Sequence, residues 1–178
     1  MSDQPLAELR SLDGLSLVRR LAAERSDPSP TAAVFGYRLT AAAPGSATLT
    51  PRADHLTATG IVHGGVTATL CDTACGYAVQ TRLPPGAYPV TRELRLRYRR
   101  PVRLDGGPLR CVATAPTLEG GLSPGAATRA RATAVVYGPD GTRLAGPRRP
   151  SPSWPAPYRD RRRETCDRGD DIDPRRNP

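Results

Sequence analysis

The sequence contains little aromatic residue and little cysteine, and it contains no lysine. Its 178 residues include one Phe, one Trp and four Cys, and all 26 basic residues are Arg. Four cysteines are too few for a disulfide scaffold, which favours a reduced, cytoplasmic setting. The longest stretch without Asp, Glu, Lys or Arg, residues 55–71, holds two histidines and three glycines and is too polar for a membrane span. The N-terminus also lacks the basic and apolar regions of a signal peptide.

Bulky aliphatic side chains are scarce in one region only. Residues 147–178 contribute Ile172 alone to the Leu, Val, Ile and Phe content, and they hold seven of the 20 prolines. Such a segment cannot bury enough apolar surface to order itself. We therefore expect an N-terminal helix and linker over 1–30, one folded domain over 31–146, and a disordered Pro/Arg-rich tail over 147–178.

The formal net charge of +9 raises nucleic acid or another polyanion as a partner. The complete replacement of lysine by arginine, however, indicates a compositional bias rather than a selected surface. No zinc-finger spacing, aromatic RNA-binding strand or Gly-rich phosphate loop accompanies the charge. The sequence thus disfavours nucleic-acid binding, which would show itself as an affinity that falls steeply with salt.

Hydrophobic periodicity predicts an α+β domain with one antiparallel sheet around a central helix. An amphipathic helix is expected over 6–21, with a break near Gly14, and a long helix over 65–82. The expected strands are 33–39, 47–52, 89–102, 109–117, 127–137 and 143–146, the last two joined by a hairpin at 139–141.

The long helix carries a carboxylate among apolar side chains. Its apolar residues point in nearly every direction, which is typical of a buried helix. Asp72 lies in the middle, and its one-turn neighbours are small, so the sequence predicts space for a ligand or water beside a buried acid. The alternative is structural: Asp72 pairs with an arginine or caps a backbone segment.

His63-Gly64-Gly65 opens the same helix. Glycines allow a substrate to approach the free N–H groups, where the helix dipole favours negative charge. Such an end can polarise a carbonyl whose oxygen becomes negative in a transition state. Gly65 and Asp72 are two turns apart, about 10 Å along the axis. If both act on one substrate atom, they must come from two antiparallel copies, so a homodimer is expected.

Three segments bring a family into view: GIVHGGV at 60–66, ATLCDTA at 68–74, and TRELRLRYRRP at 91–101. Together they resemble the signature of PaaI-like hotdog-fold acyl-CoA thioesterases over roughly residues 6–146. The resemblance implies a hotdog fold, in which a curved antiparallel β-sheet wraps a long central α-helix, here with an N-terminal amphipathic helix. It also implies hydrolysis of an acyl-CoA thioester to a carboxylate and CoA by a homodimer or homotetramer.

The resemblance assigns roles by position. Asp72 would act as general base or nucleophile, the Gly64 N–H would receive the thioester oxygen with Gly65 beside it, and His63 would hold that turn. Thr91 would orient the water or the carboxylate. This chemistry uses a base and oxyanion stabilisation, without a metal or other cofactor. Substrate contacts are expected at Gly65, Thr57, Thr69, Arg95, Arg97 and Arg99.

Two departures keep a second function open. Thr57 stands where the family usually has Asn, and prolines follow the last strand at 143–146. A non-catalytic acyl-CoA-binding or regulatory hotdog protein is therefore the alternative.

Other polar residues have simpler interpretations. The spacing of Cys71 and Cys75 could ligate a metal with His63, but small buried thiols are favoured. The arginines at 95, 97 and 99 could equally meet CoA phosphates or form a solvated strand face. His55 is expected to be exposed in a loop.

Overall fold

The computed structural model describes residues 11–24, 29–42, 45–120 and 129–147, except for the side chains of 116 and 117. The helices are α2 (Gly14–Ala23), α3 (Pro30–Phe35) and α4 (Gly64–Gln80), with short 3-10 turns η1 (Ala53–His55) and η2 (Leu104–Gly106). The strands are β1 (Tyr37–Ala41), β2 (Gly45–Leu49), β3 (Arg97–Tyr98), β4 (Leu109–Glu119), β5 (Arg129–Tyr137) and β6 (Arg143–Gly146). No helix within these residues is long and apolar enough to cross a bilayer.

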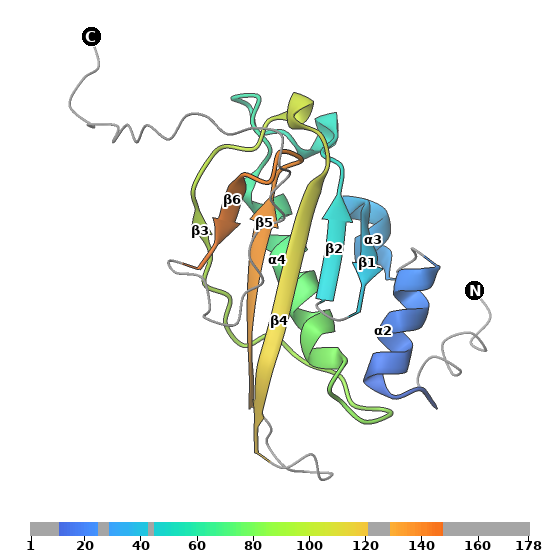
Figure 1. Ribbon diagram of the computed structural model, residues 1–178. Coiled ribbons are helices and arrows are strands. Elements are labelled where there is room, and N and C mark those ends of the chain that lie inside the picture. Colours follow the sequence, from blue (N-terminus) through green and yellow to red (C-terminus); the bar gives the residue numbers. More distant parts are fainter. Residues whose placement is uncertain (1–10, 25–28, 43–44, 121–128, 148–178) are drawn as a thin grey trace.

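The six strands form one antiparallel sheet in the order β1-β2-β4-β5-β6-β3. Helix α4 lies against one face of this sheet and contacts β2, β4 and β5 (Figure 1). Val66, Leu70 and Ala74 of α4 are buried against the sheet residues Leu109 and Val136. The α+β hotdog arrangement expected from the sequence is confirmed.

Helix α2 is confirmed over its described part and packs beside β1 (Figure 1). Asp13 caps it, because the Asp13 carboxylate accepts hydrogen bonds from the Ser16 N–H and hydroxyl at 3.0 and 2.7 Å. The buried Leu17, Val18 and Leu21 then form a second apolar cluster with Leu39 and Ala42 of the β1 region. The amphipathic pattern thus describes a helix that covers the edge of the sheet.

The strand expected over 33–39 is wrong in its first half, where α3 forms instead. Ser29 accepts a hydrogen bond from the Ala32 N–H at 3.2 Å, and Pro30 occupies the first helical position. Gly36 ends the helix in the left-handed region with φ 68°. A capping Ser, a Pro at the first position and a terminal Gly together specify one short helix, and they outweigh the β-branched and aromatic residues nearby.

The strand expected over 89–102 is also wrong for most of its length. Only Arg97 and Tyr98 pair with β6, and residues 91–100 are exposed apart from Leu96. Residues 89–98 pass over the open face of α4 before they join the sheet edge. We call them the crossing segment. Apolar and charged residues do alternate along this segment. However, the described part of the single chain contains no neighbouring strand with which the rest of the segment could pair.

Several expectations lie outside the described residues. They are the start of the first helix at 6–10, the first two residues of the strand at 127–137, and the tail from 148 onward.

Candidate functional site

The N-terminus of α4 is capped by the side chain of the preceding residue. His63 is the N-cap, and its Nδ1 accepts a hydrogen bond from the Gly65 N–H at 2.9 Å. The Val66 N–H donates to the His63 carbonyl at 3.0 Å. Within the described part of the chain, the Gly64 N–H meets no acceptor. The predicted helix-start site therefore keeps one donor, at Gly64, while His63 occupies the donor of Gly65.

Tyr98 covers the same helix start from the sheet side. Its hydroxyl donates a hydrogen bond to the Gly64 carbonyl at 2.8 Å. A Cβ at position 64 would lie 3.1 Å from both Cζ and Oη of Tyr98, so a side chain there would push the ring away. Burial, with a smaller effect of Cys71, raises the pKa of the Tyr98 hydroxyl, which keeps it a donor. No local pattern marks Tyr98 as a site residue, because in the expected strand over 89–102 it shares the apolar face with Leu94 and Leu96.

Asp72 and Thr91 meet as the resemblance implies. The Thr91 hydroxyl donates to Oδ1 of Asp72 at 2.8 Å, across 19 positions of sequence. No arginine lies within ion-pair distance of Asp72 among the residues that the structure describes. The ion-paired alternative thus has no support there, and the carboxylate keeps lone pairs available for a water molecule.

The surroundings of Asp72 differ from the expected apolar rod. In the single chain α4 buries one face only, and Asp72 lies on the other, where Thr69, Asp72 and Cys75 are half-buried and Gly65 is exposed. The helix sequence is apolar all round because small residues occupy this open face. Thr69 donates its hydroxyl hydrogen bond to the Gly65 carbonyl at 3.0 Å.

Comparisons with known proteins show what this fold and site are similar to. A model of the thioesterase superfamily matches residues 59–116, which include α4 and the crossing segment. The phenylacetic acid degradation protein PaaI of Thermus thermophilus, solved as a variant, is 27% identical, with a TM-score of 0.54 over 66% of this chain and 93% of that one. By these matches and by its fold, the chain resembles the PaaI-like hotdog proteins of the thioesterase superfamily.

Two further solved structures have the same fold. The BH2602 protein of Bacillus halodurans, solved with CoA, is 26% identical, with a TM-score of 0.56 over 82% of this chain and 88% of that one. AziG of S. sahachiroi is 20% identical, with a TM-score of 0.60 over 67% and 92%. A search of curated proteins found no match.

Thr57, which stands at the usual family asparagine, lies in the loop that precedes α4. Its hydroxyl donates to the Ile61 carbonyl at 3.1 Å and lies 2.9 Å from the hydroxyl of Thr59. Its N–H donates to the same Ile61 carbonyl at 2.8 Å. Both polar groups of Thr57 therefore stabilise the turn at 57–61.

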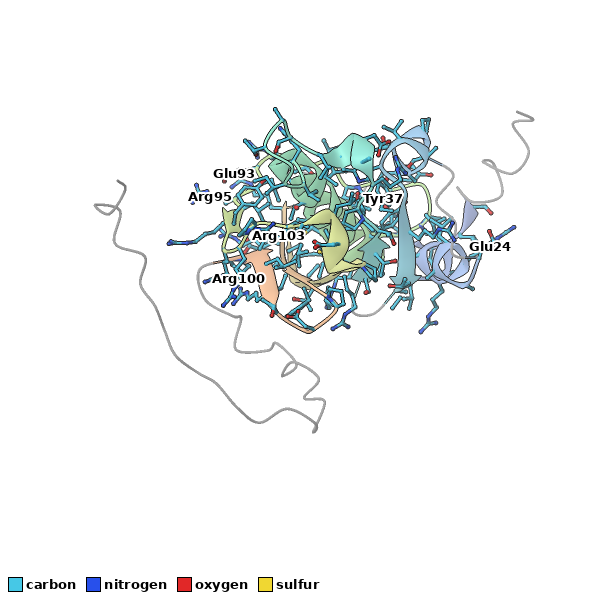
Figure 2. The ribbon with its side chains drawn as sticks, turned by 90° about the horizontal axis from the view of Figure 1, so that it is seen from above. Glu24, Tyr37, Glu93, Arg95, Arg100 and Arg103 are labelled. Carbon is cyan, nitrogen blue, oxygen red and sulfur yellow. The ribbon has the colours of Figure 1, made fainter. Side chains whose placement is uncertain are left out.

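The arginines of the crossing segment and the following residues are exposed. Arg95 pairs with Glu93 at 2.7 Å, and Arg99 donates to the Pro147 carbonyl at 2.9 Å. Figure 2 shows Arg95, Arg100 and Arg103 on the side of the molecule opposite to Glu24 of α2. A groove of about 390 Å³ contains Arg100 and Arg103 and lies between this region and the β5–β6 hairpin.

Cys71 of α4 and Cys111 of β4 are buried, and Cys75 of α4 is half-buried. Burial, together with the nearby Cys71 and Asp72, raises the pKa of Cys75 to about 12. A side-chain hydrogen bond with Cys71 and burial raise the pKa of Cys111, on β4. Protonated thiols are poor nucleophiles and poor metal ligands. No group of three or more His, Cys, Asp or Glu among the described residues is arranged to hold a metal ion.

The expectation that His55 is exposed is wrong. His55 is only 5% exposed, and its Nδ1 accepts a hydrogen bond from the Arg52 N–H at 3.2 Å. Its ring lies 6.4 Å from that of Phe35, and its carbonyl accepts from the His63 N–H at 2.8 Å. His55 thus joins η1 to the residue that caps α4, a long-range role that no local sequence pattern reveals.

Burial of His55 predicts a loss of stability in mildly acidic solution. Burial and the nearby Arg52 lower the pKa of His55 below 6.5, whereas Asp54 opposes this shift. The unfolded chain therefore takes up a proton at a higher pH than the folded chain. The stability contribution is complete above about pH 6.5 and decreases as pH falls from there toward the folded pKa.

Urea unfolding of wild type and His55→Gln across this range measures the effect. Glutamine offers an acceptor for the Arg52 N–H but does not titrate, so the variant should lose this pH dependence. Asp13, Asp54 and Asp140 do not confound the test, because their pKa values are lowered from 3.8 and their contributions are lost only in more acidic solution. Identical slopes for the two proteins between about pH 5 and 6.5 would contradict the prediction.

Proposed function

We propose that this protein is an acyl-CoA thioesterase, which hydrolyses a thioester to a free carboxylate and CoA. The observation that carries the proposal is the Asp72 carboxylate. It is half-buried, it accepts a hydrogen bond from Thr91, and it has no ion-pair partner in the described chain. A carboxylate held by a hydroxyl but not neutralised by a cation suits a general base or nucleophile.

The reaction needs two groups at the thioester. Asp72 would take a proton from water as the water oxygen bonds to the carbonyl carbon, or would itself attack that carbon. The carbonyl oxygen becomes negative, and the unpartnered Gly64 N–H would stabilise it with the help of the dipole of α4. On the general-base route, breakage of the carbon–sulfur bond then releases CoA as a thiolate and the acyl group as a carboxylic acid, which loses its proton to solvent. On the nucleophile route the same breakage leaves a mixed anhydride on Asp72, and water then cleaves this anhydride to release the carboxylate and restore Asp72.

Two copies of the chain would complete each site. Asp72 and Gly64 are eight positions apart on one helix, which separates them by about 12 Å along the axis. Four of the large exposed apolar side chains lie around the crossing segment, namely Tyr88, Val90, Leu94 and Tyr98 at 53, 85, 40 and 52% exposure. A second copy that covers this surface would bury them and would bring its Gly64 toward Asp72 of the first. We propose a homodimer, alone or within a homotetramer.

CoA is the proposed carrier of the acyl group. The Bacillus halodurans neighbour was solved with CoA. The exposed arginines at 95, 97 and 99 offer charge for its phosphates, although Arg95 is paired with Glu93 and Arg99 with a carbonyl. Gly65, Thr69 and Thr57 would lie toward the acyl end of the substrate.

A panel of aryl- and fatty-acyl-CoAs, assayed by release of free thiol, tests the activity. Release of CoA from at least one of them above the buffer rate supports the proposal. The alternative, a non-catalytic acyl-CoA-binding protein, is favoured by the engagement of Thr57 in its own turn. Binding of an acyl-CoA by calorimetry without thiol release would establish that alternative.

A further inference from the structure

The peptide group between Gly64 and Gly65 is held at both ends by side chains. At its N–H end, His63 Nδ1 accepts the hydrogen bond at 2.9 Å, and at its carbonyl end the Tyr98 hydroxyl donates at 2.8 Å. A carbonyl oxygen has two lone pairs, so the bond from Tyr98 can be added to the one that the helix itself supplies. The first N–H groups of a helix have no partner within the helix, so these two contacts add fixation where the helix itself supplies little.

Tyr98 is itself held firmly by the sheet edge. It pairs with Ala145 of β6, and the next residue, Arg99, donates its N–H to the Leu144 carbonyl at 2.8 Å. The hydroxyl of Tyr98 thus connects the edge of the sheet to the first turn of α4. The contact needs a glycine at position 64, since a Cβ would approach the ring to 3.1 Å.

The Gly64 N–H belongs to the preceding peptide group, and fixing the Gly64–Gly65 peptide restricts the two torsions of Gly64 that set the direction of this N–H. A glycine at the first helical position has more backbone freedom than any other residue, so without an external contact that N–H would sample several directions. Hydrogen-bond donors stabilise a developing oxyanion most when their direction is fixed before the reaction. We infer that Tyr98 is a positioning residue, which fixes the Gly64–Gly65 peptide so that the Gly64 N–H points at the thioester oxygen.

The crossing segment thus supplies a hydrogen bond to each of the two groups that the proposed reaction needs. Thr91 at its start bonds the carboxylate of Asp72, and Tyr98 at its end bonds the helix start. This inference rests on the proposed function only for the nature of the substrate, a thioester. The fixing of the peptide can be measured without substrate.

The test is the removal of one hydroxyl in the full chain. Tyr98→Phe keeps the ring against Gly64 but loses the hydrogen bond. Loss of one such bond should lower kcat about fivefold with KM unchanged, because the substrate is bound by other groups. In the free protein, the Gly65 amide should exchange its proton with solvent several-fold faster by NMR, while the amides in the middle of α4 keep their wild-type rates.

Two matched variants serve as controls. Tyr137→Phe removes a hydroxyl from a tyrosine of β5, outside the site and outside the proposed dimer surface, and should change neither kcat nor exchange. Thr91→Val should lower kcat but leave the Gly65 exchange rate unchanged, since it acts at the carboxylate end. A merely structural role of Tyr98 would instead raise exchange throughout α4 and lower the unfolding midpoint.

The outcomes separate the two proposals. An unchanged Gly65 exchange rate in Tyr98→Phe, or faster exchange without a fall in kcat, overturns the positioning role. If wild type releases no thiol from any acyl-CoA, the proposed function fails, and the exchange measurement alone decides whether Tyr98 fixes the peptide.

Discussion

Replacement of Asp72 by asparagine is expected to abolish hydrolysis while leaving the protein folded. Asparagine has the same shape, and its carbonyl oxygen can still accept the hydrogen bond from Thr91, which is 2.8 Å from the carboxylate in wild type. It cannot take a proton from water or attack a carbonyl carbon. The loss of a general base costs about a thousandfold in kcat. Thiol release from the best acyl-CoA of the panel, with single-turnover controls, measures it.

The controls for Asp72→Asn concern fold and affinity. Its unfolding midpoint should match that of wild type, because Asp72 is half-buried and makes no ion pair with a described residue. Its affinity for the acyl-CoA should also be retained, which distinguishes lost chemistry from lost binding. A variant that hydrolyses at the wild-type rate would remove Asp72 from the mechanism.

Mixed dimers extend this prediction to the origin of the two groups. Gly64→Val should be inactive as well, since its side chain collides with Tyr98 at the helix start. If each site takes Asp72 from one copy and Gly64 from the other, a mixed dimer of the two variants contains one intact site. Equal amounts, unfolded and refolded together, should recover about a quarter of wild-type activity, because half of the isologous dimers are mixed. Activity no greater than that of the separate variants would show that one chain supplies both groups.

Gly14→Ala is expected to destabilise the protein strongly, although it adds only one methyl group. A Cβ at position 14 would lie 1.7 Å from the Gln80 carbonyl oxygen, and both Gln80 and Leu83 present backbone rather than a flexible side chain. The Gly14 N–H also donates to the Leu83 carbonyl at 3.0 Å. Helix α2 must therefore separate from the end of α4, and we expect a loss of about 3 kcal/mol in the free energy of unfolding.

Urea unfolding of Gly14→Ala beside Gly76→Ala measures this effect. Gly76 lies within α4, and a Cβ there would meet nothing within 4 Å. Alanine is favoured over glycine inside a helix, so Gly76→Ala should be stabilised by about 0.5–1 kcal/mol. The same substitution should thus act in opposite directions at the two positions. Equal unfolding free energies for Gly14→Ala and wild type would show that α2 does not need this close approach.

The central helix, its glycine-rich start and the carboxylate in its middle could be predicted from sequence, because they depend on residues that are neighbours in the chain. His63-Gly64-Gly65 is predicted to open the helix, and the structure places the helix start there, with His63 as the N-cap. The contact between Thr91 and Asp72 followed from resemblance, since nothing local relates residues 19 positions apart. The structure brings these two together, whereas it leaves their roles as proposals.

The parts that the sequence did not reveal depend on long-range packing. His55 is buried and its ring lies 6.4 Å from that of Phe35, a contact that no periodicity in the loop indicates. Tyr98 alternates correctly for a strand, but its hydroxyl finds a carbonyl that lies 34 positions earlier. Helix α3 is different, since Ser29, Pro30 and Gly36 mark its ends by purely local signals. In that case the start and stop signals outweighed the strand propensity of the residues between them.

The packing of α2 on β1 has a practical consequence for protein production. A fragment trimmed to begin at residue 31 would remove Leu17, Val18 and Leu21, and it would leave the side chains of Leu39 and Ala42 in water. Newly uncovered aliphatic surface beside a sheet edge invites self-association during expression. Truncated versions for crystallisation should therefore keep the chain from Leu12 onward, because Leu12 also packs against this cluster, and an N-terminal affinity tag should be attached before that residue.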